Sequence, residues 1–329
     1  MQAFEYANPG TLREAVNLLP AAWGEAEVLA GGTDLLSLMK NYVVSPKRVV
    51  DLKNVQELQG ISDQRSAVRI GALVTLQELM DSELIRTSFP SLATAAEGVS
   101  SMQVRNRGTV GGDLCQRPRC WYFRSGFGLL AKDGQGKSLV PEGDNRYHAI
   151  LGNGGPAYFV NASSLAPALI ALEASVKLVG PRGERTVALA EFYRAPARDG
   201  EREHVLQPSE IVSEVVIPAG SRGRRNATYE VRQREMLDWP LATASVALDL
   251  NGANVRQARI VLGHVAPVPW RAVEAERALA GQPVNEETAT RAGETAVGGA
   301  RPLSGNAYKV QLARVVVKRA LLAAAGRRA

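Results

Sequence analysis

Two glycine pairs, each beside a threonine and an aspartate, are the residues of this sequence best suited to bind a ligand. The first is Gly31-Gly32-Thr33-Asp34, and the second is Thr109-Val110-Gly111-Gly112-Asp113. Glycine adopts positive φ without strain and leaves the backbone accessible, so successive N–H groups can point into one concavity. Such a concavity suits a phosphate, and the threonine hydroxyls would add hydrogen bonds. Two such turns could hold a pyrophosphate from both sides.

Each turn taken alone is also compatible with an ordinary loop, because glycine and aspartate are common turn residues. Their joint occurrence favours a binding role. Neither turn is a G-x-G-x-x-G dinucleotide fingerprint or a G-x-x-x-x-G-K-[ST] phosphate loop. The usual motifs for nicotinamide cofactors and nucleotide triphosphates are therefore missing from both.

The first turn lies within an alternation of strands and helices. Apolar residues on either side predict a buried strand at 28–30 and a short helix at 34–40. An edge strand at 4–9, a helix that begins after Thr11 with Glu14 in its first turn, and a strand at 48–52 surround them. This order favours a small parallel sheet with the glycine turn at the carboxyl end of a strand, where open α/β sheets bind ligands.

The second turn belongs to a longer α+β unit. We expect helices at 76–80, 92–99 and 165–174, and strands at 158–160, 176–179 and 211–217. Residues 115–156, called the insertion below, are aromatic, glycine-rich and poorly periodic. Irregular segments of this length are usually functional or contact a partner. Residues 1–55 and 56–221 are thus predicted to form two subdomains of one domain.

The remaining residues, 226–329, predict a second domain. Three strands are followed by three helices, which indicates a small α+β domain with a three-stranded antiparallel sheet and a three-helix bundle. The strands are expected at 228–232, 242–250 and 258–263, and the helices at 272–280, 286–297 and 307–322.

Composition excludes several classes of function. The 39 basic and 33 acidic residues give a net charge of +6 without a long basic run or interleaved aromatic residues, so no nucleic-acid partner is expected. No apolar run reaches the ~18 residues of a membrane-spanning helix, and no membrane partner is expected. The N-terminal residues show no export signal, which predicts a cytoplasmic chain. Cys115 and Cys120 alone form neither a disulfide framework nor a four-ligand metal site.

Together these motifs resemble the flavoprotein (medium) subunit of the molybdenum hydroxylases, the xanthine dehydrogenase and CO dehydrogenase family. The likeness covers nearly the whole chain. The two glycine turns match the family's FAD-pyrophosphate turns in order and spacing, and Ser163–Leu169 matches a third signature. Many members have an acidic residue at the position of Ser164 that bonds the ribityl chain, which a serine can also do. Residues 266–271 and 308–321 carry the likeness into the C-terminal domain.

The resemblance implies a two-subdomain FAD-binding domain with noncovalently bound FAD. Backbone N–H groups of residues 31–34 and 111–113 would hold the two phosphates. The resemblance also implies a large molybdopterin subunit and a small [2Fe–2S] subunit as partners, in a heterotrimer or a dimer of heterotrimers, and no catalytic acid or base on this chain. The implied FAD-binding residues are Leu29, Ala30, Gly31, Gly32, Thr33, Asp34, Leu35, Thr109, Gly111, Gly112, Asp113, Ser164 and Ile211.

Within the family, residues 117–124 look most like the flavin subunit of periplasmic aldehyde oxidoreductases. A comparable insertion in those relatives holds a [4Fe–4S] cluster on four cysteines. Here only Cys120 stands at such a position, and Gly128, Gly136 and Pro156 fill downstream places. Two cysteines fall short of the four thiolates that such a cluster normally takes, so we predict that the cluster is absent. This resemblance also allows a periplasmic location through export with a partner subunit.

Other positions near the implied flavin site are ambiguous. Glu230 stands where many relatives have a lysine, and an acid there would disfavour a reduced anionic flavin unless Arg232 and Arg234 offset it. Trp239, in the stretch 237–240, is a candidate to pack near the flavin ring or to fill the core. Trp121 and its neighbour Tyr122 could cover the flavin or fill the insertion.

Two other functions compete with an electron-transfer subunit. A self-sufficient FAD oxidase of the vanillyl-alcohol type shares this style of flavin domain, but it needs a large substrate domain with its own acid or base. The roughly hundred residues of the C-terminal unit are few for that purpose. A non-catalytic basic binding protein would carry no flavin, and the paired glycine turns argue against it.

Overall fold

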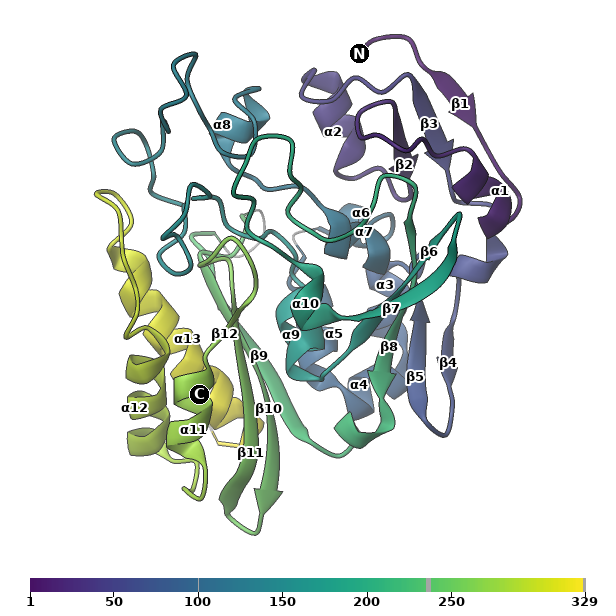
Figure 1. The fold of residues 1–329 in the computed structure, drawn as a ribbon. Helices are drawn as coiled ribbons and strands as arrows, with labels where there is room; N and C mark the ends of the chain where they lie inside the picture. The colour runs from purple at the N-terminus through teal and green to yellow at the C-terminus, as the bar shows by residue number, and fades with distance from the viewer. Residues whose placement is uncertain (100, 235–237, 328–329) are drawn as a thin grey trace.

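The computed structural model describes residues 1–99, 101–234 and 238–327, and it is an α+β fold built on three sheets (Figure 1). The N-terminal sheet lies at one end of the molecule, with the five-stranded sheet below it in Figure 1. The four-stranded C-terminal sheet stands beside the latter and carries three helices on its outer face (Figure 1). No helix among these residues is long and apolar enough to span a membrane.

The N-terminal sheet is parallel, with strand order β1-β3-β2. Thr11 accepts a hydrogen bond from the Glu14 amide, and the Glu14 carboxylate accepts one from the Thr11 amide, so the predicted start of α1 is confirmed. The first glycine turn directly follows β2, also as predicted. The elements are β1 (Glu5–Ala7), α1 (Leu12–Asn17), β2 (Ala26–Leu29), α2 (Leu35–Lys40), β3 (Arg48–Asp51) and η1 (Gln56–Leu58).

The second sheet is antiparallel, with strand order β4-β5-β8-β6-β7. Its strands are β4 (Ile61–Asp63), β5 (Ala67–Gly71), β6 (Ser175–Gly180), β7 (Gly183–Ala188) and β8 (Ile211–Pro218). Its helices are α3 (Leu76–Asp81), α4 (Glu83–Ser88), α5 (Pro90–Glu97), α6 (Met102–Arg105), α7 (Val110–Cys115), α8 (Trp121–Arg124), α9 (Ala166–Ala171), α10 (Leu189–Phe192) and η2 (Ala219–Ser221).

The strand predicted at 158–160 is wrong. This segment joins no sheet, because its neighbours are single loop contacts: the Ala149 amide donates to the Tyr158 carbonyl at 2.8 Å, and the Asn161 amide donates to the Ala266 carbonyl at 2.9 Å. The apolar side chain that suggested a strand, Phe159, instead packs against Leu130 of the insertion.

The C-terminal sheet has four strands in the order β12-β11-β10-β9, one more than the three predicted. The additional strand β12 has two residues, too few for a recognisable alternation. The strands are β9 (Arg225–Val231), β10 (Ala242–Asn251), β11 (Asn254–Gly263) and β12 (Trp270–Arg271), and the helices are α11 (Val273–Leu279), α12 (Glu286–Ala296) and α13 (Tyr308–Ala324).

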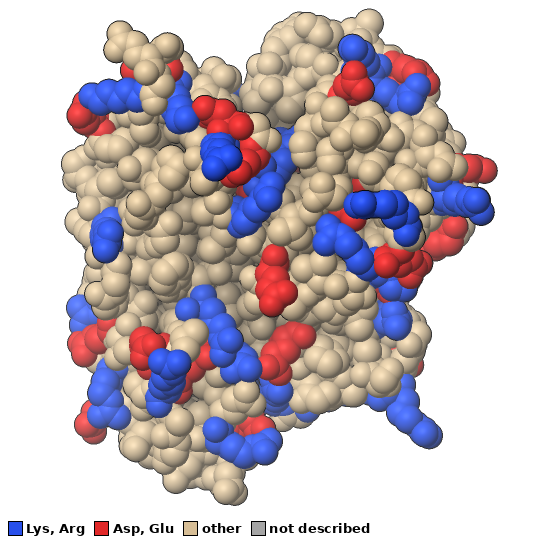
Figure 2. All heavy atoms as spheres, viewed as in Figure 1, with Lys and Arg blue, Asp and Glu red and all other residues tan. Residues whose placement is uncertain are grey.

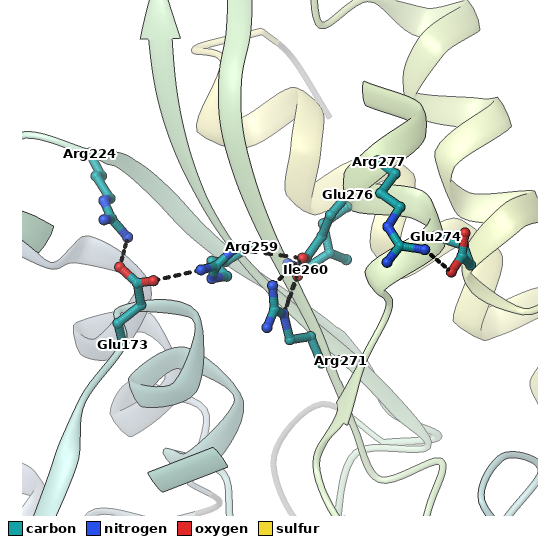
Figure 3. A network of polar contacts seen from close by, with 8 residues as sticks. All are labelled: Glu173, Arg224, Arg259, Ile260, Arg271, Glu274, Glu276 and Arg277. Atoms are coloured by element: carbon teal, nitrogen blue, oxygen red, sulfur yellow. Dashed lines mark hydrogen bonds and ion pairs between the residues drawn. The ribbon is translucent and has the colours of Figure 1, made fainter. Parts of the chain in front are cut away.

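A cluster of charged residues joins the second and third sheets. Glu173 follows α9 and pairs with Arg224 at 2.5 Å and with Arg259 of β11 at 2.7 Å (Figure 3). Arg259 also lies 3.8 Å from the buried carboxylate of Glu276, which Arg271 binds at 2.7 Å. The apolar core is continuous at the same interface, because residues of β10 and β11 pack into the core around α5 and α9.

The insertion contains one short helix, α8, and is seated on the C-terminal domain by polar side chains. Asn145 accepts from the Gly305 amide at 2.8 Å, and Asn306 donates to the His148 carbonyl at 3.1 Å. The buried Lys309 ammonium donates to the carbonyls of residues 147, 148 and 264 at 3.2, 3.2 and 2.7 Å. The irregular backbone of the insertion is therefore satisfied by specific partners on α13 and the loop before it.

Candidate functional site

The first glycine turn presents free backbone donors. Gly32 has φ of +76°, a conformation that glycine adopts without strain. In the described part of the chain, the amides of Gly32, Thr33 and Asp34 donate to no protein acceptor. Successive N–H groups that point into one concavity at a turn bind an anionic oxygen. This turn has the donor set expected of a phosphate site.

The second glycine turn differs, because its amides are used within the protein. Gly111 donates to the Ala72 carbonyl at 2.8 Å, Gly112 to the Thr109 hydroxyl at 3.1 Å, and Asp113 to the Thr109 carbonyl at 2.8 Å. The expectation that the amides of residues 111–113 cradle a phosphate is therefore wrong. The Gly111 amide ties α7 to the segment that follows β5, and the Gly112 and Asp113 amides bond to Thr109 at the start of α7. The Thr109 amide and the side chains of this turn are left to serve a ligand.

The two turns touch each other. A Cβ on Gly31 would overlap the carbonyl oxygen of Arg107 and lie 2.5 Å from its carbonyl carbon and 3.1 Å from the Gly108 nitrogen. On the other side, a Cβ on Gly108 would lie 3.6 Å from the Thr33 hydroxyl. Glycine at position 31 is thus required for the close approach of the turns, which brings Thr33 and Thr109 to one place.

Asp113 acts as a structural hub. Its buried carboxylate accepts hydrogen bonds from the Ser163 hydroxyl at 2.5 Å, the Ser164 and Leu165 amides at 3.2 and 3.0 Å, and the Gln116 side chain at 2.8 Å. Burial raises the pKa of Asp113, while these hydrogen bonds favour the ionised form. The carboxylate therefore fixes the third signature against the second turn.

Asp34 ties the first turn to the insertion. Its carboxylate accepts from the Arg117 amide at 2.8 Å and from the Arg124 guanidinium at 2.7 Å, and it pairs with Arg119 at 3.2 Å. The three arginines lie close together in the sequence, at 117–124. Their common partner, Asp34, lies 83 to 90 residues away, so the sequence did not reveal the pairing. The insertion is thereby held against the candidate site.

Two pockets meet at the glycine turns. Pocket A opens toward the C-terminal domain and includes Leu76, Val99, Val104, Arg119, Ser164, Arg232, Asp238, Trp239 and Pro240. Pocket B lies toward the N-terminal sheet and includes Trp23, Ala30, Gly31, Gly32, Leu35, Gly111, Arg117, Arg202, His204 and Ile211. The residues common to both are Thr33, Asp34, Thr109, Gly112 and Gln116. Asp113 lines pocket A. Every predicted site residue except Leu29 therefore lines at least one of the two pockets. Leu29 is buried beneath the first glycine turn, packed with Met39 and Val49.

The outer wall of pocket A combines an aromatic ring with ion pairs. The Arg119 guanidinium stacks on Trp239 at 4.2 Å, and burial lowers the pKa of Arg119 to about 10. Arg232 lines the pocket and pairs with Glu230 at 2.6 Å. Burial raises the pKa of Glu230, and Arg232 opposes this shift. Trp239 is therefore placed to contact a ligand ring, whereas Leu237, also named in that stretch, lies outside the described residues.

Pocket B also has an aromatic wall. Arg202 lies over the Trp23 ring at 4.2 Å and pairs with Glu27 at 3.3 Å. Burial raises the pKa of Glu27. His204 stands edge-on to Trp23, with ring centroids 6.0 Å apart, and burial lowers its pKa to about 4. This pocket suits a flat ring with polar edges.

Neither cysteine forms part of a metal centre in the described part of the chain. Burial raises the pKa of Cys115 to about 12 and also raises that of Cys120, whose sulfur lies 3.2 Å from Nε2 of His148. Among the described residues, no three or more His, Cys, Asp or Glu side chains are grouped so that they could hold a metal ion. The absence of an iron–sulfur cluster stays a prediction.

With two turns and two pockets in place, comparison with known families decides between the candidate functions. The family described as FAD binding domain in molybdopterin dehydrogenase matches residues 2–220, and the CO dehydrogenase flavoprotein C-terminal domain matches residues 227–324. The chain belongs to this flavoprotein family. The predicted resemblance, the α+β fold and the FAD cofactor are thereby confirmed.

Relatives of this flavoprotein match it over nearly their whole length. The carbon monoxide dehydrogenase medium chain of Hydrogenophaga pseudoflava is 33% identical, with 98% of this chain and 96% of the relative covered. The aldehyde oxidoreductase FAD-binding subunit of Escherichia coli is 30% identical, with 95% and 96% covered. The solved carbon monoxide dehydrogenase of H. pseudoflava superposes with a TM-score of 0.78 at 31% identity, covering 100% and 99% of the two chains. These comparisons give no support to a self-sufficient oxidase.

Several residues of this flavoprotein's pockets could not be found from motifs. Gln116, Trp23 and Arg202 line the pockets but stand outside any recognisable signature. Gln116 follows the second turn closely, which is the one signal that could have drawn attention to it. Trp121, by contrast, does not line pocket A or B, so the structure does not place it over a ligand in either pocket.

Proposed function

We propose that this chain is the FAD-binding electron-transfer subunit of a molybdenum-containing hydroxylase complex. The observation that carries the proposal is the pair of touching glycine turns between two aromatic-walled pockets, in a chain of the molybdopterin dehydrogenase flavoprotein family. FAD has this shape: a pyrophosphate with a flat ring system at either end. FAD supplies the redox chemistry, and the chain positions it and tunes its potential.

The free amides of Gly32, Thr33 and Asp34 would hold the pyrophosphate, with the hydroxyls of Thr33 and Thr109 beside them. Pocket A would take the isoalloxazine, because Leu76, Val99 and Val104 provide an apolar floor and Trp239 a wall. Pocket B would take the adenine beside Trp23 and Ile211. Ser164, on the rim of pocket A, would bond the ribityl chain. In this assignment every predicted site residue except Leu29 faces the cofactor. Leu29 would support the first glycine turn from beneath.

The relatives named above are medium chains or FAD-binding subunits, which implies partner chains here also. We propose a large molybdopterin subunit that oxidises an aldehyde-like substrate and a small [2Fe–2S] subunit that delivers its electrons, in a heterotrimer or a dimer of heterotrimers. Residues 1–221 would form the FAD-binding unit and residues 226–329 the unit that covers the flavin. The complex would work in the cytoplasm, or in the periplasm after export on a partner's signal.

The face shown in Figure 2 agrees with a protein partner better than with nucleic acid. Basic and acidic side chains are interspersed over it and form no extended patch of one sign (Figure 2). Nucleic-acid affinity depends on many cations facing phosphates, so a mixed surface of this kind gives little of it.

The test is an absorption spectrum of the purified chain with iron and acid-labile sulfide analysis, before and after denaturation. We expect about one FAD per chain and no iron. FAD together with about four irons would contradict the predicted absence of the cluster, and absence of flavin would refute the function. Oxidation of an aldehyde by this chain alone, without partner subunits, would instead favour the self-sufficient oxidase.

A further inference from the structure

An ion pair in pocket B joins the N-terminal sheet to the second part of the FAD-binding domain. Glu27 belongs to β2, and Arg202 belongs to the loop between α10 and β8. A guanidinium N–H of Arg202 donates to Oε1 of Glu27 at 3.3 Å, and both side chains line the pocket. Residues that are 175 positions apart in the sequence therefore meet at the wall of pocket B.

This contact leaves hydrogen-bonding capacity unused on both side chains. A guanidinium carries five N–H donors, and a carboxylate carries two acceptor oxygens. Among the described residues, the contact is the sole hydrogen bond of either side chain, so the other donors of Arg202 and Oε2 of Glu27 are left for a ligand. The side chains of Arg202 and Glu27 are 11% and 18% exposed, so a ligand in the pocket can reach them.

Aromatic packing holds the Arg202 head group in place. The guanidinium lies over the Trp23 ring at 4.2 Å, and Trp23 stands edge-on to His204. His204 in turn stacks on the buried ring of Phe192, with ring centroids 5.5 Å apart and planes at 18°. A polar pair that packing already orders loses little conformational freedom when a ligand binds, which favours affinity and selectivity.

Other charged side chains that line pocket B are paired with partners. Arg117 binds the buried carboxylate of Glu203. Glu210 binds Arg185 at 2.7 Å. A phosphate near Arg117 and Arg202 would compete with the carboxylates that already neutralise them. This end of the pocket therefore suits a neutral base that offers both donors and acceptors better than it suits an anion.

The position of the pair along β2 fits such a base. Glu27 lies four residues before Gly31, roughly 13 Å along an extended chain, which leaves room for a ribose between the glycine turn and the pair. Adenine carries an amino group that donates at N6, next to a ring nitrogen that accepts, whereas guanine carries an O6 acceptor in place of the amino group. Hypoxanthine has the same O6. A carboxylate beside a guanidinium presents the acceptor and the donor that match adenine.

We propose that Glu27 and Arg202 select adenine as the base of the bound dinucleotide. Glu27 accepts a hydrogen bond from the N6 amino group, and Arg202 donates to the neighbouring ring nitrogen. This inference rests on the proposed function, because it takes the base of FAD to lie in pocket B. A base with O6 places an oxygen lone pair against the Glu27 carboxylate, so the acceptor loses its donor and the two oxygens repel each other. The pair thereby makes the chain specific for the adenine dinucleotide.

The probe is flavin hypoxanthine dinucleotide, which differs from FAD by an oxygen in place of the N6 amino group. The full-length chain is stripped of FAD, and its affinities for FAD, for this analogue and for FMN are measured by equilibrium dialysis. We expect the wild type to bind FAD about 10- to 150-fold more tightly than the analogue, the value of one hydrogen bond to a charged group. FMN, which lacks the base, should also bind more weakly than FAD.

Glu27→Gln tests the residue itself. A glutamine amide can turn its oxygen to the N6 amino group or its nitrogen to O6, so the ratio of the two affinities should fall close to one, and the analogue should bind more tightly than it does to the wild type. Glu25→Gln is the matched control, because Glu25 does not line pocket B and its side chain is 56% exposed and pairs with Lys47 at 3.6 Å. It should keep the wild-type ratio.

Equal affinity of the wild type for FAD and the analogue would overturn the selection of adenine and leave the proposed function standing. This comparison decides the question even if Glu27→Gln fails to fold. FMN that binds as tightly as FAD would also overturn it, since the base would then contribute nothing. A Glu27→Gln chain that loses affinity for both dinucleotides by one factor would show that Glu27 only supports the pocket. A wild-type chain that neither carries FAD as purified nor binds it would instead refute the proposed function.

Discussion

Replacing Gly31 with alanine tests the contact between the two glycine turns. The new Cβ would lie 2.5 Å from the Arg107 carbonyl carbon, whereas ordinary contact begins at 3.4 Å, so the turns must separate by at least 0.9 Å. The obstructing atoms are backbone, which cannot rotate away. Overpacking of this kind costs about 1–3 kcal/mol of unfolding free energy.

The same displacement moves the free amides of the first turn relative to Thr109. A hydrogen bond to a charged group contributes roughly 1.5–3 kcal/mol, so loss of one amide-to-phosphate bond should weaken FAD binding about 10- to 150-fold. The assay is the fluorescence of FAD released during equilibrium dialysis of the chain, with thermal unfolding measured on the same samples.

Gly155→Ala is the matched control, because a Cβ there meets nothing within 4 Å and its φ is not positive. Its FAD affinity and melting temperature should equal those of the wild type. If Gly31→Ala also keeps wild-type affinity and stability, the turns do not rely on their contact, and the reasoning that places the pyrophosphate between them fails.

Three further predictions concern the groups around the site. Asp113→Asn should lower the free energy of unfolding in urea by about 2–4 kcal/mol and release FAD. The reason is that an amide nitrogen would face some of the donors whose hydrogen bonds the carboxylate accepts. Unchanged stability would show that Asp113 is not a structural hub. The free energy of unfolding should fall as the pH drops from 6.5 toward 4, since the unfolded chain then binds protons that buried His148, with a pKa of about 4, does not. The pH-dependent contribution of His148 to the free energy of unfolding is about 3 kcal/mol at most. In urea unfolding, the free energy of unfolding of His148→Phe should therefore change less with pH than that of the wild type. Glu173→Gln should lower stability by about 1–2 kcal/mol, because it removes the carboxylate that pairs with both Arg224 and Arg259. Glu274→Gln, in an exposed pair drawn in Figure 3, should change it by less than about 0.5 kcal/mol. Equal effects of the two variants in thermal melts would contradict the interdomain role.

Local signals account for what the sequence predicted well. The first glycine turn and the capped start of α1 depend on neighbouring residues, so short patterns identify them. The C-terminal strands and helices were also predicted near their observed bounds, because each shows a clear periodicity of apolar residues. The strand β7 was not predicted, since it is largely exposed and polar and shows no alternation. The resemblance to the family added the FAD assignment that turn chemistry alone left open.

Long-range contacts account for what the sequence could not predict. Asp34 and Asp113 look alike in sequence, each following a glycine pair, yet neither is simply a ligand neighbour. One carboxylate binds the insertion, and the other binds the start of α9. The partners in the insertion and at the start of α9 lie at least 50 residues away, so no local pattern distinguishes the two roles. The same limit applies to the amides of the second turn, which Ala72 and Thr109 occupy in the folded chain.

These contacts hold the insertion in place through protein groups alone. Asp34 binds three of its arginines at one end, and Asn145 together with Lys309 binds it to the C-terminal domain at the other. The insertion therefore braces the first glycine turn against the domain that closes pocket A, and it supplies Arg119, which supports Trp239. Hydrogen bonds and ion pairs at both ends hold this segment in place. Loss of cluster ligands would leave that brace intact, whereas loss of Asp34 or Lys309 would release it.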